Sequence, residues 1–281
     1  MQFAEGKMAR FESKKINELR ARCQPAFKAY QDPLSEWHLI RPFSIYFTWL
    51  FSTLGISANA VTFMGLVVGV CGGAFLSSSN ASLVFWGASL VMMSYVFDCV
   101  DGELARYYGV SSLRGTYIDA CAGDLNDFAI FMGLAFFAQT AFPDTLSMAP
   151  IVTAAIVYTR VMFRTNFWST IGLSLSRTPS PSLEEASAEA QELSQVRRTL
   201  GARILRLPTE TFFFAVLIFF SSILFFLFDF KLPLMLTWIA YLGSFLFASV
   251  YLFYKQVYLN DFDEKANTLK FNILKNSRRG H

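Results

Sequence analysis

The chain alternates between long apolar blocks and short polar segments. A transmembrane helix needs about 20 mostly apolar residues to cross the ~30 Å hydrocarbon core of a bilayer. Six blocks reach that length, at residues 59–79, 81–105, 115–141, 147–173, 208–229 and 233–258. A soluble domain could bury one such block as a core helix, but not six. The pattern therefore predicts an all-α integral membrane protein with six transmembrane helices.

Residues 1–58, which precede the first block, show a different pattern. Up to residue 40, basic side chains alternate with apolar ones, as in an amphipathic helix that lies on a membrane surface; a solvated helix is the alternative. The apolar stretch that begins at Arg41 ends near Leu54, and about 12 residues of helix cover only about 18 Å. We therefore expect an N-terminal interfacial, amphipathic helix followed by an interfacial elbow, and no cleavable signal peptide.

The distribution of charge between the blocks predicts how the chain is oriented. Three connections are nearly uncharged, at residues 77–82, 142–144 and 228–231. The N-terminus, the segment from Arg106 to Arg114, the loop at 174–207 and the tail at 259–281 carry basic residues instead. Because basic loops stay in the cytoplasm, we expect both termini and the Arg106 end on the cytoplasmic side, in the inner membrane if the source is bacterial. Two basic termini on one side require an even number of crossings, which agrees with six.

The chain thus divides into three parts: an N-terminal part at 1–58, a transmembrane domain at 59–258 and a basic cytoplasmic tail at 259–281. Within the transmembrane domain, the loop at 174–207 is the only long one. Its apolar residues recur at helical spacing, so we expect an amphipathic cytoplasmic helix there. Such a helix could gate a site or bind a partner, or serve only as a connector.

Composition agrees with a membrane protein and excludes some functions. The chain is 54% hydrophobic and 16% charged, whereas soluble domains average about 25% charged residues. A net charge of +3 is too small to indicate a nucleic-acid-binding protein, so no nucleic-acid partner is expected. The four cysteines show none of the paired spacings typical of zinc sites.

Three of the acidic residues in the second and third blocks lie near the ends at which these blocks adjoin. Asp98 and Asp101 lie near the end of the second block, and Asp119 lies about one turn into the third. A carboxylate inside a span costs about 2.5–3.5 kcal/mol, so such residues usually face a polar cavity and mark function. Residues three apart share one helix face, and an antiparallel neighbour would bring Asp119 to a similar depth. Three carboxylates at one place would repel one another, and a divalent cation such as Mg²⁺, which also pairs with substrate phosphates, removes that repulsion.

Small residues and one arginine surround these acids. Gly102, Ala105 and Gly115 leave space in which a ligand could lie, and Arg106 offers a planar guanidinium for phosphate oxygens. An acid–arginine network that only joins helices is the alternative. Three acids, two glycines and an arginine on facing helix ends exceed what such a network requires.

This stretch resembles the signature of the CDP-alcohol phosphotransferase family, D-x-x-D-G-x-x-A-R followed by eight residues, G, three residues, D, three residues and D. Seven of the eight fixed residues are present at the right spacing: Asp98, Asp101, Gly102, Ala105, Arg106, Gly115 and Asp119. The segment from Ile56 to Thr62 also resembles the family's sequence before the first span, with Ala58 where proline is usual. The predicted number of spans agrees with the family as well.

The resemblance implies an enzyme that transfers a phosphoalcohol group, of the phosphatidyl type, from a CDP-linked donor to an alcohol acceptor with release of CMP. Such enzymes act in the synthesis of phospholipids or related glycoconjugates. One or two Mg²⁺ or Mn²⁺ ions would be held by Asp98, Asp101 and Asp119. The residues around the cytidine and the phosphates would be Asn59, Thr62, Gly102, Ala105, Arg106 and Gly115. Membrane lipids would be further partners, and a homodimer is an assembly that the resemblance raises.

The chain departs from the family at the last acid, which the family uses as a metal ligand and as the base that deprotonates the acceptor hydroxyl. This chain has Gly123 there, followed by Asp124. In a regular helix, Asp124 would lie about 140° from Asp119, rather than about 40°. A π-bulge could turn Asp124 back toward the site as metal ligand and base. Alternatively, another group, a water molecule or Asp127 could act, or the chain could be a nucleotide-binding pseudoenzyme or scaffold.

Two arginines in the fourth block indicate where the acceptor binds. Arg160 and Arg164 are four residues apart and therefore share a helix face. Buried arginines in spans usually face a polar cavity, and a pair of them suits an anionic acceptor or donor head, such as a polyol phosphate. The alternative is that they pair with Asp124 or Asp127.

Overall fold

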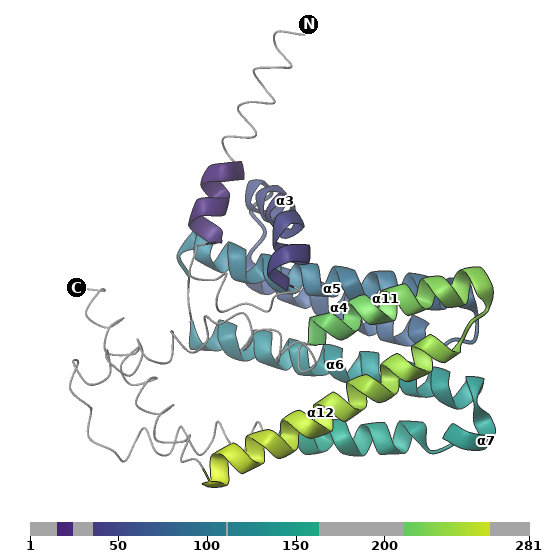
Figure 1. Cartoon of the computed structure of the whole chain (residues 1–281). Coiled ribbons are helices and arrows are strands. Elements are labelled where there is room, and N and C mark those ends of the chain that lie inside the picture. Colours follow the sequence, from purple (N-terminus) through teal and green to yellow (C-terminus); the bar gives the residue numbers. More distant parts are fainter. Residues whose placement is uncertain (1–15, 25–35, 111, 163–210, 259–281) are drawn as a thin grey trace, which may run out of the picture. The chain divides into compact units, whose positions relative to one another are not determined.

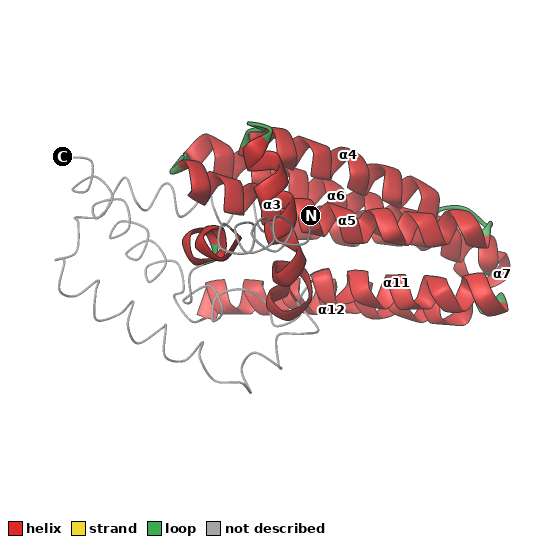
Figure 2. Cartoon of the chain, turned by 90° about the horizontal axis from the view of Figure 1, so that it is seen from above, coloured by secondary structure: helices red, strands yellow, loops and turns green. Residues whose placement is uncertain are grey.

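The residues described by the computed structural model are 16–24, 36–110, 112–162 and 211–258. Within these ranges every regular element is a helix and none is a strand (Figure 2). The predicted all-α fold class is therefore confirmed for the described residues. The predicted helix at 174–207, the tail at 259–281 and the end of the fourth apolar block lie outside them.

A short helix at residues 16–23 comes first in the described chain. The later elements are η1 (Glu36–Ile40), α3 (Arg41–Thr53), α4 (Ala58–Leu76), α5 (Ala81–Tyr108), α6 (Leu113–Ala141), α7 (Pro143–Leu146), a helix over Ala149–Met162, α11 (Thr211–Phe228) and α12 (Leu232–Tyr258). Helix α4 packs against both α5 and α6, while α11 and α3 pack against α5 (Figure 1). Helix α5 is therefore in contact with α3, α4 and α11, and also with η1.

Five of the described helices are long and apolar enough to cross a membrane: Ala58–Leu76, Ala81–Tyr108, Arg114–Ala141, Thr211–Phe228 and Leu232–Tyr251. They expose large apolar side chains, as helices in contact with lipid do, among them Phe63, Trp86 and Phe220. The helix Ala149–Met162 occupies part of the fourth predicted block but is shorter than these five. The described residues thus show five candidate spans, and the sixth stays a prediction.

The N-terminal part contains the helix at 16–23 and α3, in the stretches where the sequence predicts a surface helix and an elbow. Helix α3 has 13 residues, too few to span a bilayer. Leu19 and Cys23 of the first helix form a small buried cluster with Ile45 of α3. The two helices therefore pack against each other, and their position at a membrane surface stays a prediction.

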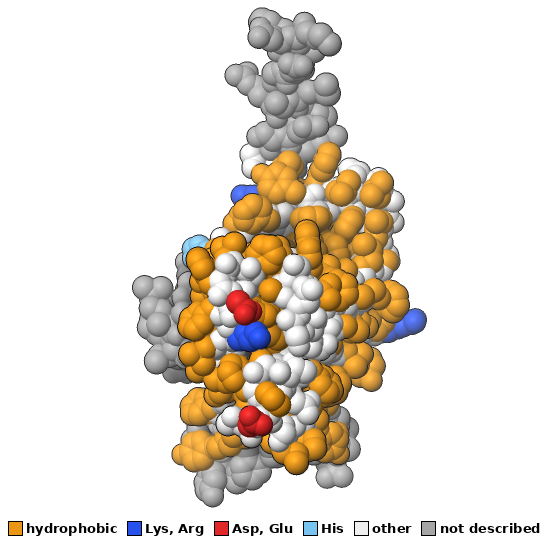
Figure 3. Space-filling view, turned by 90° about the vertical axis from the view of Figure 1, so that its right-hand side faces the viewer, with side chains coloured by type: hydrophobic (Ala, Val, Ile, Leu, Met, Phe, Trp, Pro, Cys, Tyr) orange, Lys and Arg blue, Asp and Glu red, His pale blue; other side chains and the backbone are white. Residues whose placement is uncertain are grey.

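Few charges are visible on the side of the molecule on which α7 lies. Figure 3 views that side and shows mostly apolar and uncharged side chains. The connections at 77–80 and 229–231 and α7 itself contribute only three charged residues, Asp144, Asp229 and Lys231. This agrees with the charge asymmetry from which the orientation is predicted, and the orientation itself stays a prediction.

Capping residues determine where the helices around the candidate site begin and end. The side chain of Ser57 accepts a hydrogen bond from the Ala60 amide at the start of α4, and Ser112 accepts one from the Gly115 amide (3.0 Å) at the start of α6. Helix α5 ends at Gly109, whose φ of 67° lies in the left-handed region that favours glycine. The connection from α5 to α6 is therefore short, and the two helices run antiparallel from it.

Glycines allow α4 to lie close to both of its neighbours. A Cβ added at Gly133 in α6 would overlap the carbonyl oxygen of Gly73 in α4. A Cβ added at Gly87 in α5 would lie 2.9 Å from the carbonyl oxygen of Gly72. Close backbone approach through small residues is the usual packing mode of transmembrane helices. These positions therefore require glycine for steric reasons.

The helices fall into two units: Met1–Thr153 with Glu210–Tyr241, and Ala154–Thr209 with Leu242–His281. In the first unit, the ring of Tyr241 stacks on those of Phe131 and Phe214, with centroids 4.0 and 4.4 Å away. In the second, the guanidinium of Arg160 lies 4.2 Å from the ring centroid of Phe245. The predicted donor and metal residues all belong to the first unit.

Replacing Gly133 by alanine should lower the thermal unfolding midpoint of the detergent-solubilised protein. The added Cβ would overlap the Gly73 backbone, so α4 and α6 would have to separate, at a cost of about 1–3 kcal/mol as in other overpacked cores. Gly243→Ala is the matched control, because a Cβ there meets no atom within 4 Å. Alanine favours a helix over glycine by about 0.5–1 kcal/mol. An equal loss of stability in both variants would contradict this account of the packing.

Candidate active site

A pocket opens where α4 and α6 begin and α5 ends. Its volume is about 470 Å³, within the range of about 300–1,000 Å³ typical of small-molecule sites. All of its lining residues lie between Ser57 and Asp119 and so belong to the first unit. It brings together the six residues that the sequence predicts around a CDP-linked donor: Asn59, Thr62, Gly102, Ala105, Arg106 and Gly115.

Two helix N-termini contribute to the pocket, which the residue pattern alone did not lead us to expect. Ser57 and Ala58 line it from the start of α4, and Ser112 and Thr116 from the start of α6. The exposed N–H groups and the macrodipole of a helix N-terminus favour anions, phosphate among them. A sequence signal was available, because a serine directly before a helical block is a typical N-cap.

Two of the three predicted metal-binding acids line the pocket from neighbouring helices. Asp101 in α5 is only 6% exposed and accepts a hydrogen bond from Thr62 Oγ1 in α4 (2.5 Å). Asp119 in α6 is exposed. Asp98, one turn before Asp101, is also exposed, and its carboxylate lies within electrostatic range of Asp101 and Asp119. The three acids are therefore neighbours, and Thr62 fixes the orientation of one of them.

The pocket fits a metal ion that is shared with substrate phosphates. Among the described residues, no three or more His, Cys, Asp and Glu side chains are arranged to hold one metal ion. Mg²⁺ usually keeps several water molecules and binds one or two carboxylates together with phosphate oxygens, rather than a complete protein cage. Asp101 and Asp119, which line the same pocket, suit that mode of binding. The larger ligand set of Asp98, Asp101, Asp119 and Asp124 stays a prediction.

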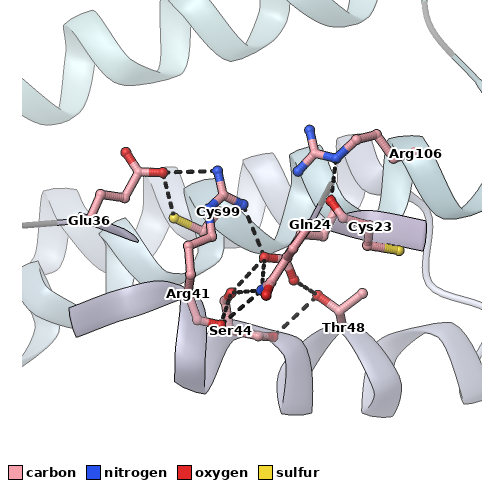
Figure 4. A network of polar contacts seen from close by, with 9 residues as sticks. Cys23, Gln24, Glu36, Arg41, Ser44, Thr48, Cys99 and Arg106 are labelled. Atoms are coloured by element: carbon pink, nitrogen blue, oxygen red, sulfur yellow. Dashed lines mark hydrogen bonds and ion pairs between the residues drawn. The ribbon is translucent and has the colours of Figure 1, made fainter. Parts of the chain in front are cut away.

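Arg106 lines the pocket, and a residue that does not line the pocket holds its guanidinium in place. Its Nε donates a hydrogen bond to the Cys23 carbonyl oxygen at 2.6 Å (Figure 4). Gly102, one turn earlier, lies beside the guanidinium: a Cβ there would be 3.4 Å from Arg106 Nη1, an ordinary van der Waals contact. Burial and the nearby Glu103 carboxylate raise the pKa of the Cys23 thiol to about 11, so this thiol stays protonated at neutral pH. The pocket thus combines a guanidinium with two helix N-termini, a set that favours phosphate.

The helix does not turn Asp124 toward the pocket. Helix α6 is α-helical at every residue from Leu113 to Ala141, so the π-bulge considered for Asp124 is not formed. Asp124 then lies about 140° around the helix from Asp119. It is not among the described residues that line the pocket. At Gly123, a Cβ would meet no atom within 4 Å. The prediction that Asp124 is metal ligand and base therefore loses the distortion on which it depended.

Asp127 is held by two tyrosines. Its Oδ1 accepts hydrogen bonds from the hydroxyl groups of Tyr95 (3.3 Å) and Tyr241 (3.4 Å). These contacts join α6 to α5 and α12. Two phenol donors account for the presence of a carboxylate in a span at this position.

The predicted acceptor residues are described only in part. Arg160 lies in the second unit, over the ring of Phe245, and Arg164 lies outside the described residues. Their role in acceptor binding stays a prediction.

Curated relatives share one name. The phosphatidylinositol phosphate synthase of Mycobacterium marinum is 29% identical over 108 residues, which are 37% of this chain and 45% of that protein. The phosphatidylinositol phosphate synthase of Streptomyces avermitilis is 35% identical over 81 residues, 29% of this chain and 32% of that protein. The chain thus spans less than half the length of these curated relatives.

Solved structures with the same name resemble the chain at low identity. The crystal structure of Mycobacterium tuberculosis phosphatidylinositol phosphate synthase with CDP-DAG bound has a TM-score of 0.48 and 16% identity, and the match covers 76% of this chain and 94% of that one. The structure of the same synthase with manganese and citrate has a TM-score of 0.46 and 17% identity, and covers 75% and 88%.

A family assignment follows from a longer match. The model of the CDP-alcohol phosphatidyltransferase family matches residues 55–250, which are more than half of the chain and include every residue that lines the pocket. The chain therefore belongs to the CDP-alcohol phosphatidyltransferase family.

Proposed function

We propose that this chain is a membrane-bound transferase that moves a phosphoalcohol group of the phosphatidyl type from a CDP-linked donor to an alcohol acceptor and releases CMP. The observation that carries the proposal is the pocket in which Arg106, Asp101, Asp119 and two helix N-termini meet. Family membership supports this class of reaction. Because the matched relatives are phosphatidylinositol phosphate synthases, the proposed role is in phospholipid or related glycoconjugate synthesis.

The donor would bind through its pyrophosphate and its cytidine. Arg106 and the N–H groups at the starts of α4 and α6 are the groups suited to pyrophosphate oxygens. Asn59 has an amide that can both donate and accept hydrogen bonds, which suits the edge of a cytosine. Gly102, near the end of α5, and Gly115, near the start of α6, line the pocket without a side chain.

One or two Mg²⁺ or Mn²⁺ ions would be held by Asp101 and Asp119, with Asp98 beside them. When bound, a divalent ion supplies positive charge that neutralises the phosphates and polarises the reacting phosphoryl group. Thr62 holds the Asp101 carboxylate in place through its hydrogen bond, so little reorganisation is needed when the site fills. Positioning and charge neutralisation are the main contributions to this kind of transfer.

The pocket and both termini would face the cytoplasm, because the basic segments lie at the pocket end of the spans in the sequence. The CDP-linked donor would then come from the membrane and the acceptor from the cytoplasm. A homodimer is the assembly that we propose by analogy with the family.

Purified protein should release CMP from CDP-diacylglycerol or a related CDP-linked donor only when Mg²⁺ or Mn²⁺ and a suitable alcohol are present. Asp119→Asn should lower this release about 100-fold or more, because a lost metal ligand removes several kcal/mol of charge stabilisation. Asp144→Asn, which changes an exposed acid in α7, is the control and should behave like the unmodified chain. Full activity in Asp119→Asn would reject the site.

Donor binding without turnover in the unmodified chain would favour the alternative, a nucleotide-binding pseudoenzyme or scaffold, for which Gly123 is the supporting observation.

The missing acid can be tested by restoring it. Gly123→Asp places a carboxylate one turn after Asp119, in open space, and should raise kcat for CMP release about 10²–10⁴-fold, the usual contribution of a general base. Asp124→Asn should leave kcat near that of the unmodified chain, because the regular helix directs Asp124 away from Asp119. If instead Asp124→Asn abolishes transfer and Gly123→Asp adds nothing, then Asp124 is the base.

Arg160 and Arg164 would bind an anionic group of the acceptor, such as the phosphate of a polyol phosphate. An arginine stacked on an aromatic ring, as Arg160 is on Phe245, presents its N–H donors around the edge of the stack. Arg160→Ala should therefore raise the acceptor KM about 10-fold or more, because hydrogen bonds to charged groups contribute about 1.5–3 kcal/mol. Arg160→Lys, which keeps the charge, should show a smaller effect. An unchanged acceptor KM together with a lower unfolding midpoint would show that Arg160 only pairs with an acid inside the protein.

A further inference from the structure

Glu103 is a buried carboxylate that the proposed reaction does not use. It lies in α5, and its side chain is fully buried against α3. Four donors, all labelled in Figure 4, reach its two oxygens: Ser44 Oγ and Thr48 Oγ1 at 2.6 Å, Gln24 Nε2 at 2.8 Å and Arg41 Nη1 at 3.0 Å. A carboxylate with this many donors is held in place by the protein, so its contribution is structural rather than chemical.

Gln24 is the donor that connects this network to the N-terminal helix. It directly follows the helix at 16–23, and its amide nitrogen donates to the Glu103 carboxylate and to the Arg41 carbonyl oxygen, each at 2.8 Å. An amide NH₂ group has two hydrogens, so it can make both bonds at once. The end of the N-terminal helix is therefore fastened to α5 and to α3 by one side chain.

The residue before Gln24 contacts the arginine of the pocket. The Cys23 carbonyl oxygen accepts the hydrogen bond from Arg106 Nε at 2.6 Å. Glu103 and Arg106 are three residues apart on α5 and share a face, so two successive residues of the N-terminal segment bond to two neighbouring side chains of α5. A guanidinium is planar and rigid, so holding Nε also determines the direction of its other N–H groups.

We infer that the segment of Cys23 and Gln24 positions Arg106 for the phosphates of the donor, with Gln24 and Glu103 as positioning residues. Glu103 holds Gln24, Gln24 fixes the Cys23 carbonyl, and this carbonyl orients the guanidinium that lines the pocket. The inference rests on the proposed function, because it assigns Arg106 to the donor phosphates. It also makes a segment that precedes the matched family region at 55–250 part of the donor site.

Gln24→Met removes both amide donors and keeps the approximate length of the side chain. In the full chain with Mg²⁺, this substitution should weaken binding of CDP-diacylglycerol about tenfold, as expected when a hydrogen bond to a charged group loses its geometry. The donor KM should rise while kcat changes little, because Arg106 would bind the ground state and the transition state alike. In an Arg106→Ala background, Gln24→Met should cause no further loss of donor affinity.

Two controls separate positioning from general destabilisation. Asn17→Ala changes an exposed residue of the same helix and should leave donor affinity unchanged. Thr237→Val removes a buried hydroxyl that bonds to Ser221 at 3.1 Å, so it should lower the unfolding midpoint without changing donor affinity. Unchanged donor affinity in Gln24→Met would overturn the inference, as would equal losses in the unmodified and Arg106→Ala backgrounds. If the unmodified chain neither binds the donor nor releases CMP, the proposed function fails and the inference fails with it. That result is distinguishable from the two outcomes above, which both require an unmodified chain that binds the donor.

Discussion

The short connection between α5 and α6 is the constraint on which the candidate site depends. Gly109 ends α5 in a left-handed conformation, and Ser112 caps the start of α6. Because the chain turns back so soon, Asp101 and Arg106 near the end of α5 lie beside Asp119 near the start of α6. The same turn exposes the N-terminus of α6 to the pocket, next to that of α4. The residues that reverse the chain therefore also provide groups that favour an anion.

Five acids of the first unit differ in how their carboxylates are placed. Glu103 and Asp127 are satisfied by protein donors, a four-donor network in one case and two tyrosine hydroxyls in the other. Asp98 and Asp119 are exposed. Asp101 combines both features: it is buried and accepts a hydrogen bond from Thr62, and it also lines the pocket. Buried polar groups need hydrogen-bond partners, so Glu103 and Asp127 join helices, while Asp101 and Asp119 line the pocket. This division explains how one chain carries several carboxylates in its spans without all of them acting in one site.

The sequence predicted those features that depend on local spacing. The helical class, the five candidate spans among the described residues and the neighbourhood of Asp98, Asp101 and Asp119 all follow from the apolar period and from residues three apart on a helix. It did not predict that Glu103 would be buried, because within D-G-E-L-A-R nothing distinguishes a paired acid from an exposed one. It did not predict the contact of Gln24 with Glu103 either, since the two residues are far apart in the chain. The π-bulge at Gly123, one of the alternatives that the sequence left open, is not formed, because a regular helix satisfies the backbone there without it.

The substitution at Gly123 affects one part of the proposed chemistry more than the others. Transfer of a phosphoryl-type group depends chiefly on positioning and on neutralising charge, whereas a general base contributes about 10²–10⁴-fold. The chain retains the groups suited to positioning the donor: Arg106 with its carbonyl support, the two helix N-termini and the acids beside them. What it lacks at position 123 is the acid that the family resemblance implies as the base for the acceptor hydroxyl. Loss of that group alone would slow turnover without removing donor binding. A chain with this pocket is therefore expected to bind the donor and to turn over slowly, rather than to be inactive.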